Sequence, residues 1–216
     1  MSQLAALLIS SAPPAILVVV KIIYYRTIDP LGLIIVFGYV LSAIISVIDG
    51  NPRVLLLRES IVTCATGIIF LITMIPLKVG KFQMRPLIYG VTQQMMSVTP
   101  PVKYVYKGEV IDQSRAEFCW QWSTVFRRGI YTMTAAWGII LVLEFVAKLI
   151  MYFSSLTVDQ MVLYGNIILG VTLGSMGLFN TIYSRSIRLN TIKETAQVQK
   201  QLEEEAEQQH TYLDDA

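Results

Sequence analysis

The sequence is poor in the residues that build most metal centres and hydrolytic sites. It contains one histidine, His210, and two cysteines, Cys64 and Cys119. Because His210 lies in a polar C-terminal segment, a histidine-based zinc site and a Ser-His-Asp triad are both excluded. The cysteines lie in an apolar and in an aromatic stretch, at a spacing typical of neither a metal site nor a disulfide framework. We therefore predict no metal and no cofactor.

Charge is scarce as well. Charged residues make up 15% of the chain and hydrophobic residues 54%, and the mean hydropathy is +0.58. These values indicate an integral membrane protein. Because each crossing needs about 20 residues, a chain of 216 residues is predicted to form an all-α, multi-pass bundle of five or six transmembrane helices. A separate soluble domain does not fit in this length.

The charges that are present are unevenly distributed. Residues 1–193 hold sixteen Lys and Arg and eight Asp and Glu, whereas residues 194–216 hold one and seven. Basic residues scattered at helix ends follow the positive-inside rule, so the expected partner is a lipid bilayer and not nucleic acid. We predict a membrane bundle over 1–184, followed by a cytoplasmic polar helix and an acidic, disordered tail over 185–216.

Proline and capping residues divide the apolar stretches. A helix is kinked or begun by Pro13-Pro14, a second is predicted over 31–48, and a third begins after Asn51-Pro52. Residues 103–115 read as a loop, with Asp112 capping a short aromatic helix at the lipid headgroups. Further helices are predicted over 129–153 and 158–183. The number of spans depends on the short segment 86–98, which follows a basic loop.

Counting basic residues on each side gives eleven against five if segment 86–98 crosses the membrane, and fourteen against two if it does not. Both counts place the C-terminus in the cytoplasm. They differ on the N-terminus, which is cytoplasmic with six spans and outside with five.

Two carboxylates in apolar helices are the candidate catalytic residues, because charges inside a membrane are costly and are kept for pairing or for function. Glu59 lies about 10 Å into its helix, and it is either a structural ion pair or a functional acid. Glu144 is spaced i, i+4 from Lys148, so an ion pair between them is the main alternative to catalysis.

Residues that could line a substrate site lie near these carboxylates in sequence or carry charge at helix ends. Thr63 and Thr66 continue the helix face of Glu59. Arg58 can instead reach the headgroups, Trp137 can pack in the bundle, and two basic residues can anchor the interface. The full candidate set is Arg58, Thr63, Thr66, Trp137, Arg127 and Arg128.

Small residues at helical spacing predict surfaces where helices approach closely. Gly38 shares a face with Ser42 and Ser46, which predicts a tight hairpin between the second and third helices. Gly170 and Gly174 form a GxxxG arrangement. These glycine faces also make homo- or hetero-oligomers a possible form of the protein.

Several short runs occur in an ordered set within residues 5–185: Asp29-Pro30-Leu31-Gly32, Gly50-Asn51-Pro52-Arg53, Leu55-Leu56-Leu57-Arg58-Glu59-Ser60, Arg85-Pro86-Leu87, Phe126-Arg127-Arg128 and Thr134-Ala135-Ala136-Trp137-Gly138. Together they resemble a family of small polytopic membrane proteins of fungi and bacteria, which is distantly similar to intracellular septation protein A. The resemblance implies a bundle of five or six spans. It implies no catalytic role for any residue. Some fungal members occur beside secondary-metabolite genes.

Two functions follow from these features. The first is an intramembrane enzyme, independent of cofactors, that uses a carboxylate as acid or base to cyclise or isomerise a lipophilic small molecule or to open its epoxide. Its setting would be secondary-metabolite biosynthesis. The second is a membrane protein without enzymatic activity, either a small transporter or a structural protein that binds partners.

Overall fold

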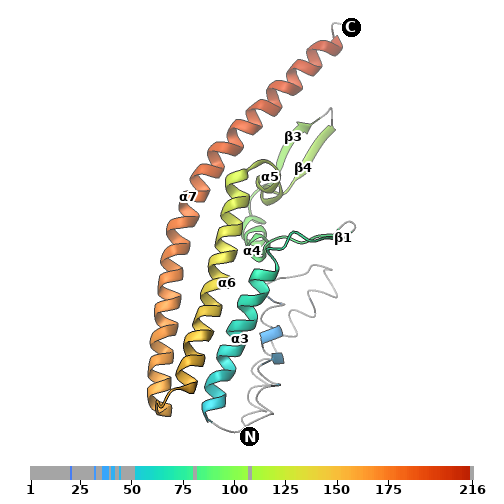
Figure 1. Cartoon of the computed structure of the whole chain (residues 1–216). Coiled ribbons are helices and arrows are strands. Elements are labelled where there is room, and N and C mark those ends of the chain that lie inside the picture. The colour runs from blue at the N-terminus through green and yellow to red at the C-terminus, as the bar shows by residue number, and fades with distance from the viewer. Residues whose placement is uncertain are drawn as a thin grey trace. The chain divides into compact units, whose positions relative to one another are not determined.

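Figure 1 shows the computed structural model, which describes the backbone of residues 52–79, 82–106 and 109–214 and a few isolated positions before them. Side chains are described for residues 60–77, 83–106 and 109–205, and at the isolated positions. The predicted helix at Pro13 and most of the one at 31–48 lie outside the described residues. The chain forms two compact units, Met1–Gly90 with Thr134–Gly177 and Val91–Met133 with Leu178–Ala216.

The described part of the chain is mostly helical, which confirms the predicted class. The helices are α3 (Pro52–Ile72), α4 (Leu87–Met96), α5 (Arg115–Trp122), α6 (Thr124–Phe153) and α7 (Val158–Asp214). Two antiparallel pairs of short strands lie between the helices: β1 (Lys78–Val79) with β2 (Phe82–Gln83), and β3 (Val102–Tyr106) with β4 (Glu109–Gln113).

Helices α6 and α7 are each long and apolar enough to cross a membrane. The core helix of a soluble protein would be mostly buried. In each of these two helices, only 11% of the 18-residue apolar stretch is buried. Large apolar side chains such as Leu143, Ile150 and Leu163 are more than half exposed. Surfaces of this kind are typical of helices that face lipid.

The segment predicted as a polar loop over 103–115 is instead a β-hairpin followed by a short helix. Val102 is opposite Gln113 and Tyr106 is opposite Glu109. The strand alternates, because Tyr104 is buried while its neighbour Lys103 is exposed. Apolar side chains at every second position give the hairpin one buried face, which stabilises it. The many polar residues of this segment led to the prediction of a loop.

The predicted helix cap at Asp112 is wrong. Asp112 lies in β4, opposite Lys103, and the two side chains form an exposed ion pair with 3.7 Å between Oδ2 and Nζ. The N-cap of α5 is Ser114, whose hydroxyl accepts a hydrogen bond from the amide of Glu117. Serine and aspartate are equally good N-cap residues, so residue type alone did not show whether Asp112 or Ser114 begins α5.

Within the first unit, α3 and α6 cross closely at two glycines and lie side by side in Figure 1. A Cβ added to Gly67 would lie 2.9 Å from the carbonyl oxygen of Gly138. Gly38 lies against Val62 of α3, where an added Cβ would be 3.3 Å from Cγ1. This contact agrees with the predicted hairpin between the second and third helices.

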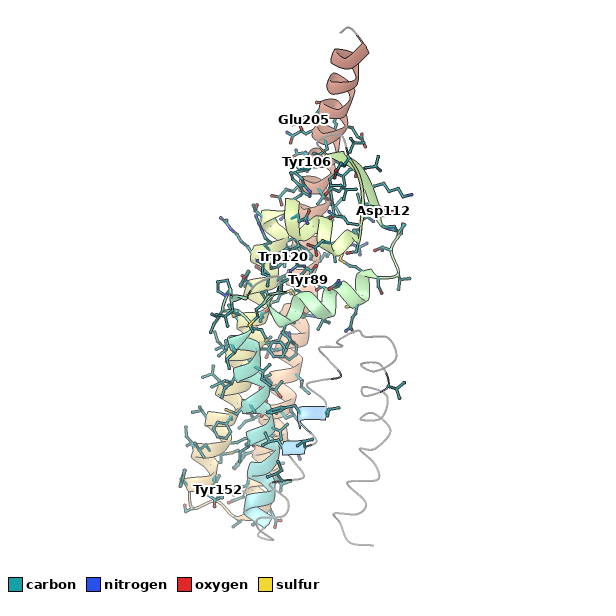
Figure 2. All side chains as sticks on the ribbon, turned by 90° about the vertical axis from the view of Figure 1, so that its right-hand side faces the viewer. Tyr89, Tyr106, Asp112, Trp120, Tyr152 and Glu205 are labelled. Atoms are coloured by element: carbon teal, nitrogen blue, oxygen red, sulfur yellow. The ribbon has the colours of Figure 1, made fainter. Side chains whose placement is uncertain are left out.

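Within the second unit, the β3–β4 hairpin and α5 pack against the C-terminal part of α7. Tyr104, Phe118 and Leu202 form the buried cluster, and partly buried neighbours surround it. The rings of Tyr104 and Phe118 meet edge to face at 5.2 Å. Figure 2 shows the hairpin beside the stretch of α7 that carries Glu205. Of the aromatic residues of α5, Phe118 belongs to this cluster and Trp122 packs against it. The position of α5 at the lipid headgroups stays a prediction.

Helix α7 continues without a break through the boundary predicted at residue 184. It ends at Asp214, so the segment predicted as a disordered tail is helical over most of its length. The reason is local, because residues 189–205 are rich in helix-forming Lys, Gln and Glu. Leu202 also anchors this segment in the cluster with Tyr104 and Phe118.

Candidate functional site

A buried ion pair on α6 is the main polar feature of the first unit. Lys148 Nζ donates a hydrogen bond to Glu144 Oε1 across 2.7 Å. The Glu144 side chain is 1% exposed and the Lys148 side chain 13%. The i, i+4 spacing places both residues on one face of the helix. The pairing predicted from the sequence is therefore confirmed.

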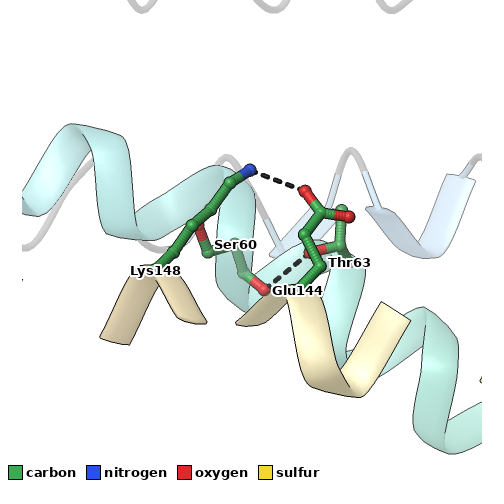
Figure 3. Close-up of polar contacts among 4 residues, drawn as sticks. All are labelled: Ser60, Thr63, Glu144 and Lys148. Carbon is green, nitrogen blue, oxygen red and sulfur yellow. Dashed lines mark hydrogen bonds and ion pairs between the residues drawn. The ribbon is translucent and has the colours of Figure 1, made fainter. Parts of the chain in front are cut away.

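Helix α3 contributes two hydroxyl residues at the level of this pair. Figure 3 shows Ser60 and Thr63 on α3 facing the side chains of Glu144 and Lys148. Ser60 is fully buried, and the Thr63 hydroxyl donates to the Ser60 carbonyl oxygen at 2.9 Å. Two charged groups and two hydroxyl residues thus meet where two apolar helices pack.

A close contact between Gly67 and Gly138 brings α3 and α6 together near these four polar residues. Gly138 lies less than two turns before Glu144, and Gly67 lies two turns after Ser60. Because no side chain separates the helices at the glycines, their backbones approach closely near the ion pair. The ammonium and the carboxylate are therefore covered on the side of α3.

Of the other site residues predicted on α3, the structure describes the side chain of only one. Thr66 donates its hydroxyl hydrogen to the carbonyl oxygen of Val62 at 2.8 Å, within its own helix. Arg58 and Glu59 belong to α3, but their side chains lie outside the described residues. Of the two candidate catalytic carboxylates, the structure therefore places only Glu144.

The predicted residues of α6 separate into two groups. Trp137 is half-buried and precedes Glu144 by seven residues, which puts it on the same face of the helix. Arg127 and Arg128 are exposed and lie near the N-terminus of α6, in the second unit. Glu144 and Trp137 belong to the first unit.

A second polar site, which the sequence did not predict, lies at the start of α6. The Glu194 carboxylate of α7 accepts hydrogen bonds from the hydroxyl of Ser123 at 2.5 Å and from the hydroxyl of Thr124 at 2.7 Å. The amides of Thr124 and Val125 also donate to it, each at 3.2 Å. Glu194 thus binds the positive end of the helix dipole.

Ser123 caps two helices, α5 at its end and α6 at its start. Its amide donates to the carbonyl oxygen of Cys119 and ends α5, while its hydroxyl oxygen accepts from the amide of Phe126 and begins α6. Burial of Glu194 opposes ionisation, but the four hydrogen bonds outweigh it and lower the pKa of this carboxyl. The sequence analysis did not predict a cap at Ser123, and its partner Glu194 lies 71 residues away in the chain.

The fold and the site together define a helical protein with two lipid-length apolar helices and a buried ion pair on one of them. Comparison with protein-family models, with curated proteins and with solved structures finds no match. Among the residues that the structure describes, no three His, Cys, Asp or Glu side chains are grouped to hold a metal ion.

Proposed function

We propose that this chain is a multi-pass integral membrane protein that acts on a lipophilic small molecule at the Glu144–Lys148 pair. The observation that carries the proposal is a salt bridge between side chains that are 1% and 13% exposed, within an apolar helix. Placing ionisable groups at membrane depth costs about 2.5–3.5 kcal/mol each on insertion scales, so such groups generally serve a function.

The topology follows from helix length and charge. Helix α4 has ten residues and reaches about 15 Å, half the thickness of the hydrocarbon core, so by itself it does not cross. This length favours five spans with the N-terminus outside. The C-terminal end of α7 lies in the cytoplasm in this proposal, because the basic residues that end the spans lie on that side.

The chemistry available at the pair is proton transfer without a cofactor. Lys148 Nζ–H can donate a hydrogen bond to a carbonyl or epoxide oxygen of the substrate. Glu144 can remove a proton from a neighbouring carbon and return it at another, which isomerises the substrate with no net gain or loss of protons. Ring closure follows the same balance: a hydroxyl of the substrate attacks an epoxide carbon, the epoxide C–O bond breaks, and the proton lost by the hydroxyl ends on the epoxide oxygen.

Deletion of the gene in the source organism, followed by untargeted comparison of lipophilic metabolites, tests this proposal. Loss of one compound with accumulation of a precursor identifies the substrate class. Complementation with Glu144→Gln or Lys148→Met should not restore the product, whereas exposed Glu203→Gln should. An unchanged metabolite profile, or full complementation by both site variants at wild-type protein level, contradicts the enzymatic role.

A second candidate is a structural membrane protein that binds another helix. It is favoured by Gly170 and Gly174 of α7, because a Cβ added to either would meet no atom within 4 Å. A GxxxG face open on the surface of a lipid-length helix suits a partner helix. If Gly170→Leu and Gly174→Leu abolish a cross-linked complex in native membranes while metabolites stay unchanged, this second function is supported over the first.

A further inference from the structure

Four of the exposed arginines of the second unit lie on α6 and α7. They are Arg127 and Arg128 near the N-terminus of α6 and Arg185 and Arg188 of α7. None of the four forms a salt bridge with any residue that the structure describes. The nearby stretches 124–133 and 178–193 contain no acidic residue, so nothing in them neutralises the positive charge. We call this set the arginine collar.

A direct helix contact places the members of the collar at one level. A Cβ added to Gly129 of α6 would lie 2.4 Å from Cδ1 of Ile187 on α7, so the two helices touch at this point. Each arginine lies within two residues of Gly129 or Ile187, which is about 3 Å along the helix axis. Arg127 and Arg128 are successive residues and turn by about 100° on α6, whereas Arg185 and Arg188, spaced i, i+3, share one face of α7.

The apolar surface of α7 begins directly beside the collar. Leu178 and Ile182, which precede Arg185 by two turns and one turn, are 64% and 63% exposed. Arginine side chains are long enough to keep their stems on such an apolar surface while the guanidinium reaches the headgroup region. The collar thus lies where a lipid-facing surface meets water.

The nearest carboxylate along α7 does not cancel this charge. Glu194 is held at the N-terminus of α6 by Ser123, Thr124 and Val125. Its charge is therefore matched by amides and hydroxyls, and its oxygens face the helix end. The arginine guanidinium groups remain available to an external anion.

We propose that the arginine collar binds the phosphate groups of anionic phospholipids in the leaflet where α6 begins and the apolar part of α7 ends. The inference rests on the proposed membrane location and is independent of any chemistry at Glu144. Guanidinium groups bind phosphate through paired hydrogen bonds, and basic residues at the end of a span are attracted to an anionic leaflet. Two pairs of arginines at one level of the helix pair can bind more than one headgroup of the surrounding leaflet.

The experiment uses the purified full-length protein in detergent, with equal amounts of a phosphatidylglycerol and a phosphatidylcholine of the same acyl chains. Native mass spectrometry counts each lipid retained. The collar variants are Arg127→Gln with Arg128→Gln, and Arg185→Gln with Arg188→Gln. The control is Lys103→Gln with Lys200→Gln, which removes two exposed cations that already pair with Asp112 and Glu204.

We expect the wild type and the control to retain phosphatidylglycerol preferentially, and each arginine removed to weaken that retention about fivefold. Equal retention of both lipids by the wild type, or unchanged preference in both collar variants, overturns the inference. Free inorganic phosphate added at the same concentration should not compete, because the site is proposed for headgroups in a leaflet; full competition overturns it as well. Carbonate extraction of native membranes separately tests the membrane location, since release of the chain contradicts the proposed function itself.

Discussion

Glu194 of α7 binds Ser123 at the start of α6, with 2.5 Å between Oε2 and Oγ and 71 residues between them in the sequence. The carboxylate also receives the amides of Thr124 and Val125. One side chain thus fastens the polar end of α7 to the first turn of α6. Several measurable consequences follow from this contact and from the packing around Glu144.

The Glu194 contact should contribute stability that depends on pH. Glu194→Gln should lower the free energy of unfolding by about 1–2 kcal/mol at neutral pH, as expected for the loss of a charged helix cap. Because the folded-state pKa lies below the usual 4.5, this stability is present above pH 4.5 and is lost as the pH falls through the folded pKa. Thermal unfolding in detergent between pH 3 and 7 measures it.

The matched control for this prediction is exposed Glu203→Gln, which removes one negative charge from the same helix. The control should keep the wild-type pH dependence, whereas Glu194→Gln should lose the part of it that lies below pH 4.5. The same melting profile in both variants would show that the Ser123 contact contributes nothing to stability.

Breaking the Glu144–Lys148 pair from one side should be more harmful than removing both charges. Glu144→Ala leaves the Lys148 ammonium without its carboxylate, which should cost about 3–5 kcal/mol. The double variant Glu144→Leu with Lys148→Met removes both charges and should recover most of that loss. Unfolding midpoints of the single and double variants give the coupling energy, and additive effects would contradict a direct pair.

The glycine contact between α3 and α6 should not tolerate a methyl group. Gly67→Ala places Cβ 2.9 Å from a backbone oxygen of Gly138, which forces the helices apart and should cost about 1–3 kcal/mol. Gly165→Ala on α7 is the control, because a Cβ there meets no atom within 4 Å. If both variants unfold at the same temperature, the close crossing of α3 and α6 is wrong.

The cluster beneath the β-hairpin should hold the last part of α7 in place. Phe118 is 2% exposed and contacts Tyr104 and Leu202, so Phe118→Ala should cost about 3–5 kcal/mol locally. Limited proteolysis should then cleave α7 near residue 200 faster than in the wild type. Val110→Ala, at a position that is 74% exposed, should leave the cleavage rate unchanged.

The features that the sequence predicted correctly depend on local spacing. The i, i+4 pair of Glu144 and Lys148 follows from the pitch of one helix, and so do the apolar lengths of α6 and α7. The helical class follows from the same periodicity. The β3–β4 hairpin was missed because Lys103 and Asp112, which lie on its exposed face, make the segment read as a polar loop.

The sequence by itself determined which stretches are apolar, that the class is helical and that Glu144 has a partner within reach, because each depends on residues a few positions apart. Only the tertiary structure decided that Glu194 caps α6, that Gly67 meets Gly138 and that Phe118 of α5 is buried beside Leu202. These contacts join residues far apart in the chain, and their free energy comes from burial and hydrogen bonding between elements, which no local pattern records.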